Sequence, residues 1–399
     1  MRDDTKVVRA IWFCMVFHHA VAFLNVYDPY EASFWNVYIP DASSFHGDGS
    51  HFAGLSEPEW KFRSGEVVTG STIYTQVLGF FYRHVGSSHL FGKELSVLAF
   101  VLSCVLLVKL VGFLALSRFR VGIVLLYGLL PSAVIFRSVT LRESWQALFF
   151  LLSVYWATRL WKQSGILNVS FLLISTSCLA LTHHGLANFA MYLIAISVFW
   201  AIFGRKKNVR WARHLRFLFA GLLIACVIIS SQKLGLFMTL GEALERGAGM
   251  RQTLLSYTDV RTNFSFILDT SSVFGIVTTL PMVFVEYMFA PFPWQVENVE
   301  DICAFFESIL RFVLLFSAVS SWRRSSGEVR SCYGFLLIVV LGLELVWALG
   351  TTNWGTATRH HVTGYSVLVL LGAPGLILFM RRLHFMMFGR RRDNTMLPQ

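Results

Sequence analysis

Charged residues are scarce in this sequence. Only 14% of its 399 residues are Asp, Glu, Lys or Arg, whereas 55% are hydrophobic and the mean hydropathy is +0.59. A soluble domain carries about 25% charged residues. The composition therefore excludes an ordinary soluble protein and predicts one that lies in a membrane.

Cysteine pairs and nucleotide-binding motifs are also missing. The six cysteines stand singly, without a CxxC spacing, and this argues against a disulfide framework or a cysteine-based zinc site. The sequence has no GxxxxGK[ST], GxGxxG, GxSxG or HExxH motif. It therefore favours neither ATP hydrolysis nor nucleotide-sugar chemistry on a soluble module. A substrate would have to bring its own activated bond.

Apolar runs of about 17 to 25 residues recur along the chain, each long enough to cross a bilayer as a helix. We expect one all-α polytopic transmembrane domain over 1–399, with about ten spanning helices. The first run lacks a small-residue cleavage site and is therefore expected to be a span, not a signal peptide. The expected spans are 8–27, 94–116, 121–136, 143–161, 168–182, 186–204, 216–231, 302–321, 332–350 and 362–380.

Basic residues mark one side of this arrangement. The net charge is +11, and Lys/Arg-rich connections occur at 117–120, 159–163, 205–216, 322–330 and after residue 380. Placing them in the cytoplasm satisfies the positive-inside rule and puts both termini inside. Because the basic blocks serve as topology signals, we expect no nucleic-acid partner.

One more apolar stretch, 272–291, does not fit an even number of crossings. It ends in Pro291-Phe292-Pro293-Trp294, where the prolines break a helix and Trp suits the membrane interface. A re-entrant or interfacial helix is the preferred prediction, and a true span is the alternative.

With this topology, the unusual polar segments fall on the non-cytoplasmic face. Two long outer loops, 28–90 and 232–271, lie there, and the first is expected to contain interfacial helices. Ionisable residues at membrane depth are costly and usually face a cavity. The further polar segments on this side are 136–144, 182–185, 291–294 and 353–361. Their convergence predicts one polar site.

Arginines and histidines of this face have two interpretations. Arg137, Arg142 and Glu143 at an outer turn either anchor helix ends or hold a phosphate or pyrophosphate, with Glu143 orienting an arginine. His183 and His184 either make interfacial hydrogen bonds or bind sugar hydroxyls or phosphate oxygens.

The segment NWGTATRHH at 353–361 has the same two interpretations. Arg359 and His360 form either an interfacial anchor or a clamp for a phosphate headgroup. His361 is expected to stay at the membrane boundary.

The first outer loop supplies candidates for a general base. It contains Asp28, Asp41 and His46 among other acidic residues and histidines. As a set facing arginines, these side chains can supply a base and ligands for a possible divalent metal ion.

Four short motifs carry a resemblance. They are Asp41-Ala42-x-x-Phe45-His46, Pro131 with Leu141-Arg142-Glu143, Pro291-Phe292-Pro293-Trp294, and Gly355-Thr356-Ala357-x-Arg359-His360. With them the chain resembles bacterial membrane glycosyltransferases of the GT-C superfamily, including family-39-like proteins. It also resembles the related O-antigen and exopolysaccharide polymerases.

The resemblance implies a protein of the bacterial inner membrane. It would move a sugar from a polyprenyl phosphate or pyrophosphate carrier to a hydroxyl of a carbohydrate acceptor on the extracytoplasmic face. Asp41 would act as base, with Asp28 as the rival. The lipid-linked sugar, membrane lipid, the acceptor and polysaccharide assembly or export proteins are the expected partners.

The physical case for the arginines is separate from the family. Cations placed at the leaving phosphate would stabilise the transition state by about 3 to 4 kcal/mol per donor. Arg142 and Arg359 are the expected donors, with Arg137, His360, His183 and His184 in the next layer.

Three alternatives remain. A polymerase of lipid-linked oligosaccharide repeats uses the same bond chemistry, a flippase would move the lipid-linked sugar, and an assembly subunit would have no catalysis. The chain shows no clear internal repeat, and its charges gather at one face, which favours an enzyme over a transporter.

Overall fold

The protein is an all-α membrane protein. The computed structural model describes residues 2–27, 40–55, 70–163, 165–203, 249 and 262–388. Its helices are α1 (Arg2–Tyr27), α2 (Pro40–Gly54), α3 (Gly70–Val85), α4 (His89–Phe113), η2 (Ser117–Phe119), α5 (Arg120–Leu129), α6 (Pro131–Arg137), α7 (Glu143–Lys162), α8 (Ile166–Thr182), α9 (His184–Phe203), α12 (Val273–Phe289), η3 (Pro293–Gln295), α13 (Val299–Arg324), α14 (Gly327–Gly350) and α15 (Trp354–Phe388).

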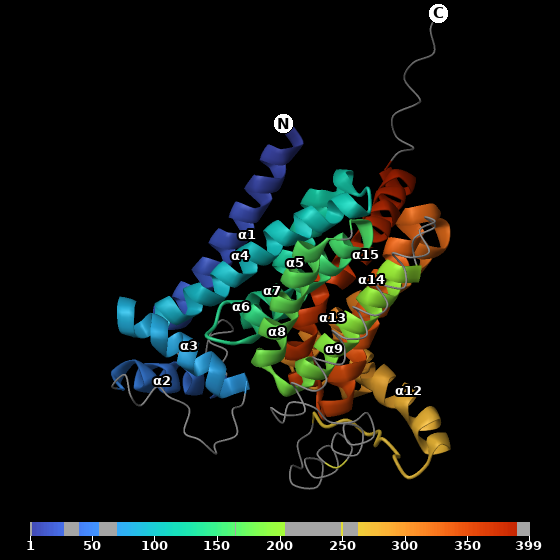
Figure 1. Ribbon diagram of the computed structural model, residues 1–399. Coiled ribbons are helices and arrows are strands. Elements are labelled where there is room, and N and C mark those ends of the chain that lie inside the picture. Colours follow the sequence, from blue (N-terminus) through green and yellow to red (C-terminus); the bar gives the residue numbers. More distant parts are fainter. Residues whose placement is uncertain are drawn as a thin grey trace, which may run out of the picture.

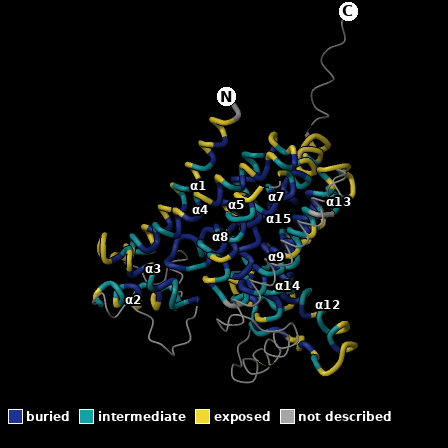
Figure 2. The backbone as a smooth tube through the Cα atoms, in the orientation of Figure 1, coloured by how far each residue is buried: buried dark blue, intermediate teal, exposed yellow. Residues whose placement is uncertain are grey.

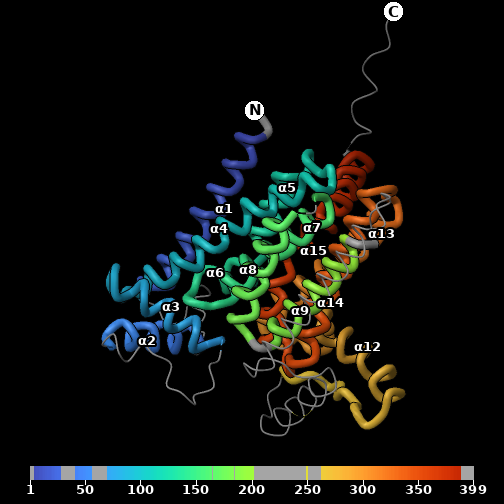
Figure 3. The backbone as a smooth tube through the Cα atoms, in the orientation of Figure 1, coloured from blue at the N-terminus to red at the C-terminus, as the bar shows by residue number. Residues whose placement is uncertain are grey.

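The two ends of the bundle differ. The first turn of α1 and the last turns of α15 lie at one end, whereas α2, α3 and α12 lie at the other (Figure 1). The same separation can be followed along the tube in Figure 3. The expected location of both termini in the cytoplasm stays a prediction.

Several helices have the length and composition of membrane spans. Among the described residues five helices qualify, α1, α4, α13, α14 and α15, and a sixth span arises if a bent pair is counted as one. The expected spans 143–161, 168–182 and 186–204 are α7, α8 and α9, of which α8 and α9 are apolar but short. The expected span 216–231 lies outside the described residues.

The expected single span at 121–136 is wrong in one respect. Pro131 divides it, and the segments Ser117–Leu129 and Pro131–Arg137 meet at an angle of 63°. Proline has no N–H to donate and its ring clashes with the preceding turn, so a helix breaks there and restarts with proline in its first position. The break turns α6 into the bundle.

The last span also begins earlier than expected. The helix starts at Trp354 instead of 362, so Arg359, His360 and His361 belong to α15 and not to a loop. Asn353 explains the start, because its side-chain oxygen accepts a hydrogen bond from the Thr356 N–H at 2.8 Å. An Asn at this position satisfies a free N–H of the first turn.

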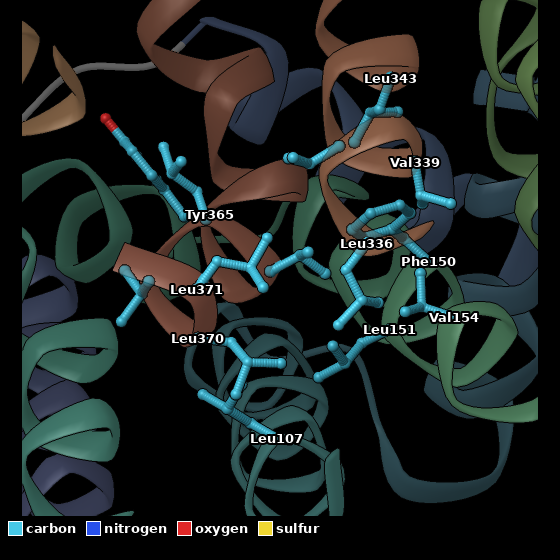
Figure 4. Close-up of a cluster of buried hydrophobic side chains, with 14 of the residues drawn as sticks. Leu107, Phe150, Leu151, Val154, Leu336, Val339, Leu343, Tyr365, Leu370 and Leu371 are labelled. Atoms are coloured by element: carbon cyan, nitrogen blue, oxygen red, sulfur yellow. The ribbon is translucent and has the colours of Figure 1, made fainter. Parts of the chain in front are cut away.

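Helix α15 lies at the centre of the bundle and packs against α13, α7, α14 and α5. Gly372 allows its close contact with α13, since a Cβ there would lie 2.4 Å from the Leu314 carbonyl oxygen. Figure 2 shows the buried residues concentrated along the middle of the bundle. Leu370 and Leu371 of α15 meet Leu107, Phe150, Leu151 and Leu336 in the core (Figure 4).

The segment expected at 272–291 forms α12, a helix of 17 residues. It is apolar but shorter than the five helices that qualify as spans, and it contains Pro281. Its expected re-entrant or interfacial position stays a prediction. The loop 232–271 is described only from residue 262, apart from residue 249.

The topology can be tested at the two ends of α13. We expect a cysteine at Gln295→Cys to react with a membrane-impermeant maleimide added outside the cell, and one at Ser326→Cys to react only after permeabilisation. Both are introduced into a background without other cysteines. Labelling of Gln295→Cys from the cytoplasmic side alone would contradict the topology.

Candidate functional site

Arg359 brings three distant segments together. Its Nη1 donates a hydrogen bond to Asp41 Oδ2, and its Nε lies 3.1 Å from Glu143 Oε1. Asp41 is in the first turn of α2, Glu143 is the first residue of α7, and Arg359 is in the second turn of α15. The structure thus places Asp41 and Glu143, two of the three predicted carboxylates, on the same predicted arginine.

The two carboxylates differ in exposure. The Asp41 side chain is 50% exposed, the Arg359 side chain 18% and the Glu143 side chain 2%. A guanidinium that has lost most of its water needs anionic partners, because an unpaired buried charge is costly. Glu143 is therefore the fixed partner, while Asp41 faces solvent.

Arg142 completes this group of charges. Its Nη1 donates to Ser71 Oγ at 2.7 Å, and its guanidinium lies 5.7 Å from the centre of the Phe45 ring. Burial lowers the pKa of Arg142, while the carboxylates of Glu143 and Asp41 oppose this shift. Arg142 therefore belongs to the same group of interacting charges as Arg359.

The motif around Asp41 now has a structural explanation. Phe45 lies one turn after Asp41 on α2, where it is buried against the Tyr74 ring at 5.1 Å between centroids. This contact fixes α2 on α3 and sets Asp41 at the edge of the bundle. We name the four charged residues Asp41, Arg142, Glu143 and Arg359 the charge cluster.

The start of α3 connects the charge cluster to the predicted histidines. Ser71 holds Arg142, and the neighbouring Gly70 lies against the end of α8, where a Cβ would come within 2.3 Å of the Thr182 carbonyl oxygen. Only glycine fits such an approach to backbone. His183 is the residue after Thr182, so the start of α3 lies beside it.

His183 and His360 lie together beside the charge cluster. The His360 ring stacks on Trp347 at 3.9 Å, and the His183 ring meets the same indole at 4.8 Å. Thr351 Oγ1 pairs with His360 Nδ1 at 2.8 Å. The two histidines and Trp347 thus form an aromatic wall, and their role in a second layer around a phosphate stays a prediction. The side chain of His184 lies outside the described part.

His361, expected at the membrane boundary, is buried inside the bundle. It is 1% exposed, its Nδ1 pairs with Glu344 Oε2 at 2.7 Å, and its Nε2 lies 3.2 Å from the Tyr287 carbonyl oxygen. The Tyr287 hydroxyl donates to the same Glu344 oxygen at 3.1 Å. His361 therefore ties α15 to α12 and α14.

A second buried network was missed from the sequence. Arg311 Nη1 donates to the Tyr365 hydroxyl at 2.7 Å, and that hydroxyl donates to Glu307 Oε2 at 3.0 Å. Glu307 also accepts from the Ser132 N–H at the start of α6, at 2.6 Å. Ionisable residues inside the expected spans 302–321 and 332–350 were the available signal.

The remaining predicted residues lie elsewhere. Arg137 is fully buried inside the bundle, where its Nη2 donates to the Val362 carbonyl oxygen at 3.1 Å and its guanidinium covers the Tyr127 ring at 4.1 Å. With these contacts Arg137 lies apart from the charge cluster, where the phosphate headgroup was expected to bind. Asp28 lies outside the described residues.

His46 lies in a third group, between α2, α3 and α4. Its Nδ1 pairs with the Tyr82 hydroxyl at 2.8 Å and its ring stacks on His89 at 3.6 Å. Burial lowers the pKa of His46 to about 4, and the neighbouring His89 and Lys93 add to this. Among the described residues, no group of three or more His, Cys, Asp or Glu side chains is placed to hold a metal ion.

Comparisons with known proteins assign this chain to no family. No protein-family model matches the chain, and no curated protein does. A solved structure with some likeness is the archaeal oligosaccharyltransferase AglB from Archaeoglobus fulgidus in complex with an inhibitory peptide and a dolichol-phosphate. The TM-score is 0.47 and the identity 9%, over 97% of this chain and 52% of that one. This chain therefore spans about half the length of that protein, and a likeness at this level assigns it no activity.

The contacts of His361 should make a measurable contribution to the stability of the protein. We expect His361→Leu to lower the free energy of unfolding in detergent by about 1 to 2 kcal/mol, because Glu344 loses one of its partners in an apolar interior. The control His84→Leu, at an exposed position of α3, should change it by less than about 0.5 kcal/mol. Equal effects of the two substitutions would contradict the role of His361.

The His46 contacts predict a dependence on pH. Because the folded pKa is about 4 and the ordinary value is 6.5, the unfolded segment binds more protons between these values, so docking of α2 should weaken as pH falls from 6.5 towards 4. Hydrogen exchange of α2 amides, corrected for intrinsic rates, measures this. His46→Gln should reduce the pH dependence and His51→Gln, an exposed control on α2, should not. An unchanged dependence in His46→Gln would refute the assignment.

Proposed function

We propose that the protein is a membrane glycosyltransferase of GT-C type. It moves a sugar unit from a polyprenyl phosphate or pyrophosphate carrier to a hydroxyl acceptor, in the synthesis of cell-surface polysaccharide or glycoconjugate. The single observation that carries the proposal is the contact of Arg359 with both Asp41 and Glu143, beside Arg142. A candidate base and two candidate phosphate ligands thus lie within one site.

The proposed reaction assigns a role to each member of the charge cluster. Asp41 removes the proton from the acceptor hydroxyl, whose oxygen attacks the anomeric carbon. The bond from that carbon to the carrier phosphate breaks, and the phosphate leaves with the bonding electrons. Arg142 and Arg359 stabilise the charge that develops on the leaving oxygen. Glu143 holds Arg359 in place.

The location of the charge cluster suits a lipid-linked donor. It lies where α2 covers the bundle, at the end opposite the first turn of α1 (Figure 1). With both termini in the cytoplasm, as the basic connections predict, this end faces the extracytoplasmic side of a bacterial inner membrane. A carrier phosphate would then lie at headgroup depth while its polyprenyl chain stays among the lipids.

His183 and His360 border the proposed site. Of this aromatic group His183 is partly exposed, whereas His360 and Trp347 are buried and stacked on each other. Aromatic faces and imidazole nitrogens suit the hydroxyls and apolar faces of a sugar ring. We assign His183 to the sugar or the acceptor, with Trp347 and His360 as the group that positions its ring. Polysaccharide assembly or export proteins are the proposed partners.

Transfer of a radiolabelled sugar by the purified protein tests the proposal. Carrier-linked monosaccharide and carrier-linked repeat unit are offered separately, and product length separates a glycosyltransferase from a polymerase. We expect Arg142→Ala and Arg359→Ala each to lower kcat/KM by about 100- to 1,000-fold, and Asp41→Asn to lower it by about 100- to 10,000-fold.

The control is Asp48→Asn, which removes a carboxylate from an exposed position of the same helix, α2. It should keep full activity. Full activity in Asp41→Asn would refute the assignment of the base, and full activity in both arginine variants would favour a non-catalytic subunit. Movement of the lipid-linked sugar across the membrane without transfer would show a flippase.

A further inference from the structure

The proposed base and a proposed phosphate ligand are bound to each other. Arg359 Nη1 donates to Asp41 Oδ2, and both groups are needed for other partners if the proposed function is correct. A carboxylate oxygen that accepts a hydrogen bond from a guanidinium is occupied, so it cannot at the same time accept a proton from an acceptor hydroxyl. Without donor, the enzyme therefore holds its proposed base on Arg359.

Of the two carboxylates on Arg359, only Asp41 is placed to leave. Glu143 begins α7 in the interior and is 2% exposed, whereas the Asp41 side chain is 50% exposed. Asp41 lies on α2, which packs on α3 at the edge of the bundle. Its carboxylate can regain water when it leaves the arginine, and Glu143 stays on Arg359, so this contact costs less to break than the contact with Glu143.

Charge balance identifies what takes its place. Arg142 and Arg359 face Asp41 and Glu143, so the charge cluster holds two cations and two anions. A phosphate group binds guanidinium N–H donors in the same geometry as a carboxylate does. Replacement of Asp41 by the anionic phosphate of a lipid carrier keeps a negative charge beside Arg359.

We propose that the phosphate of the lipid-linked donor displaces Asp41 from Arg359 and so frees the carboxylate for the acceptor. Donor binding thereby creates the site for the acceptor hydroxyl. This inference rests on the proposed function and adds an order to it, donor first and acceptor second. By thermodynamic linkage, bound acceptor strengthens donor binding by the same factor.

Competition between Asp41 and phosphate makes an unusual prediction for binding. Removal of the Asp41 carboxylate abolishes transfer but should tighten donor binding, because the phosphate no longer has a competitor. We expect the Kd of a polyprenyl monophosphate to fall by about 3- to 10-fold in Asp41→Asn and in Asp41→Ala, the factor that corresponds to the net strength of one typical hydrogen bond. The alanine variant excludes a new bond from the asparagine amide.

The experiment measures binding of a polyprenyl monophosphate to the full chain in lipid nanodiscs. Asp48→Asn controls for the loss of one negative charge from α2 and should leave Kd unchanged. Asp41→Glu keeps a competing carboxylate and should bind nearly as the wild type does. Thermal melting of each variant confirms that it is folded.

The outcomes separate the inference from the proposed function. If Arg359→Ala weakens binding but neither Asp41→Asn nor Asp41→Ala tightens it, the displacement is wrong and the proposed function stands. If Asp41→Glu tightens binding as much as Asp41→Ala, competition by the carboxylate is also refuted. If the wild type does not bind a polyprenyl phosphate in an Arg359-dependent way, the proposed function itself fails.

Discussion

The arrangement of the site depends on the ion pairs that the Arg359 guanidinium makes with Asp41 and Glu143. This guanidinium is largely withdrawn from water, and such a charge is tolerated only beside anions. Asp41 and Glu143 supply them from α2 and α7, which are far from α15 in the sequence. One side chain thus attaches the covering helix α2 to the centre of the bundle and sets the geometry of the charge cluster.

Helix α15 makes polar contacts on two of its sides. Residues two apart on an α-helix point about 200° apart. Arg359 therefore reaches α2 and α7, whereas His361 reaches Glu344 on α14 and the Tyr287 carbonyl on α12. A buried carboxylate and imidazole on one side hold the helix in the orientation that the arginine needs on the other side.

The backbone of α3 links the parts of the site. Its first residues place Ser71 on Arg142 and Gly70 against the end of α8, beside His183. The first residues of α3 therefore connect the charge cluster to the aromatic wall.

The sequence by itself determined the membrane class, the all-α fold, most helix positions and the residues of the charge cluster. These follow from local composition, since apolar length decides a span and proline or asparagine decides where a helix breaks or begins. Asp41, Arg142, Glu143 and Arg359 could be selected because charges are rare and costly in such a chain.

Only the tertiary structure decided how these residues pair. Arg137 and His46, selected by the same criterion as Arg359, lie in other groups, and His361 proved to be buried, on Glu344. The networks of Glu307 and Glu344 were missed because each partner comes from another helix. The rotation and depth of every helix set these distances, and both depend on packing between segments remote in sequence.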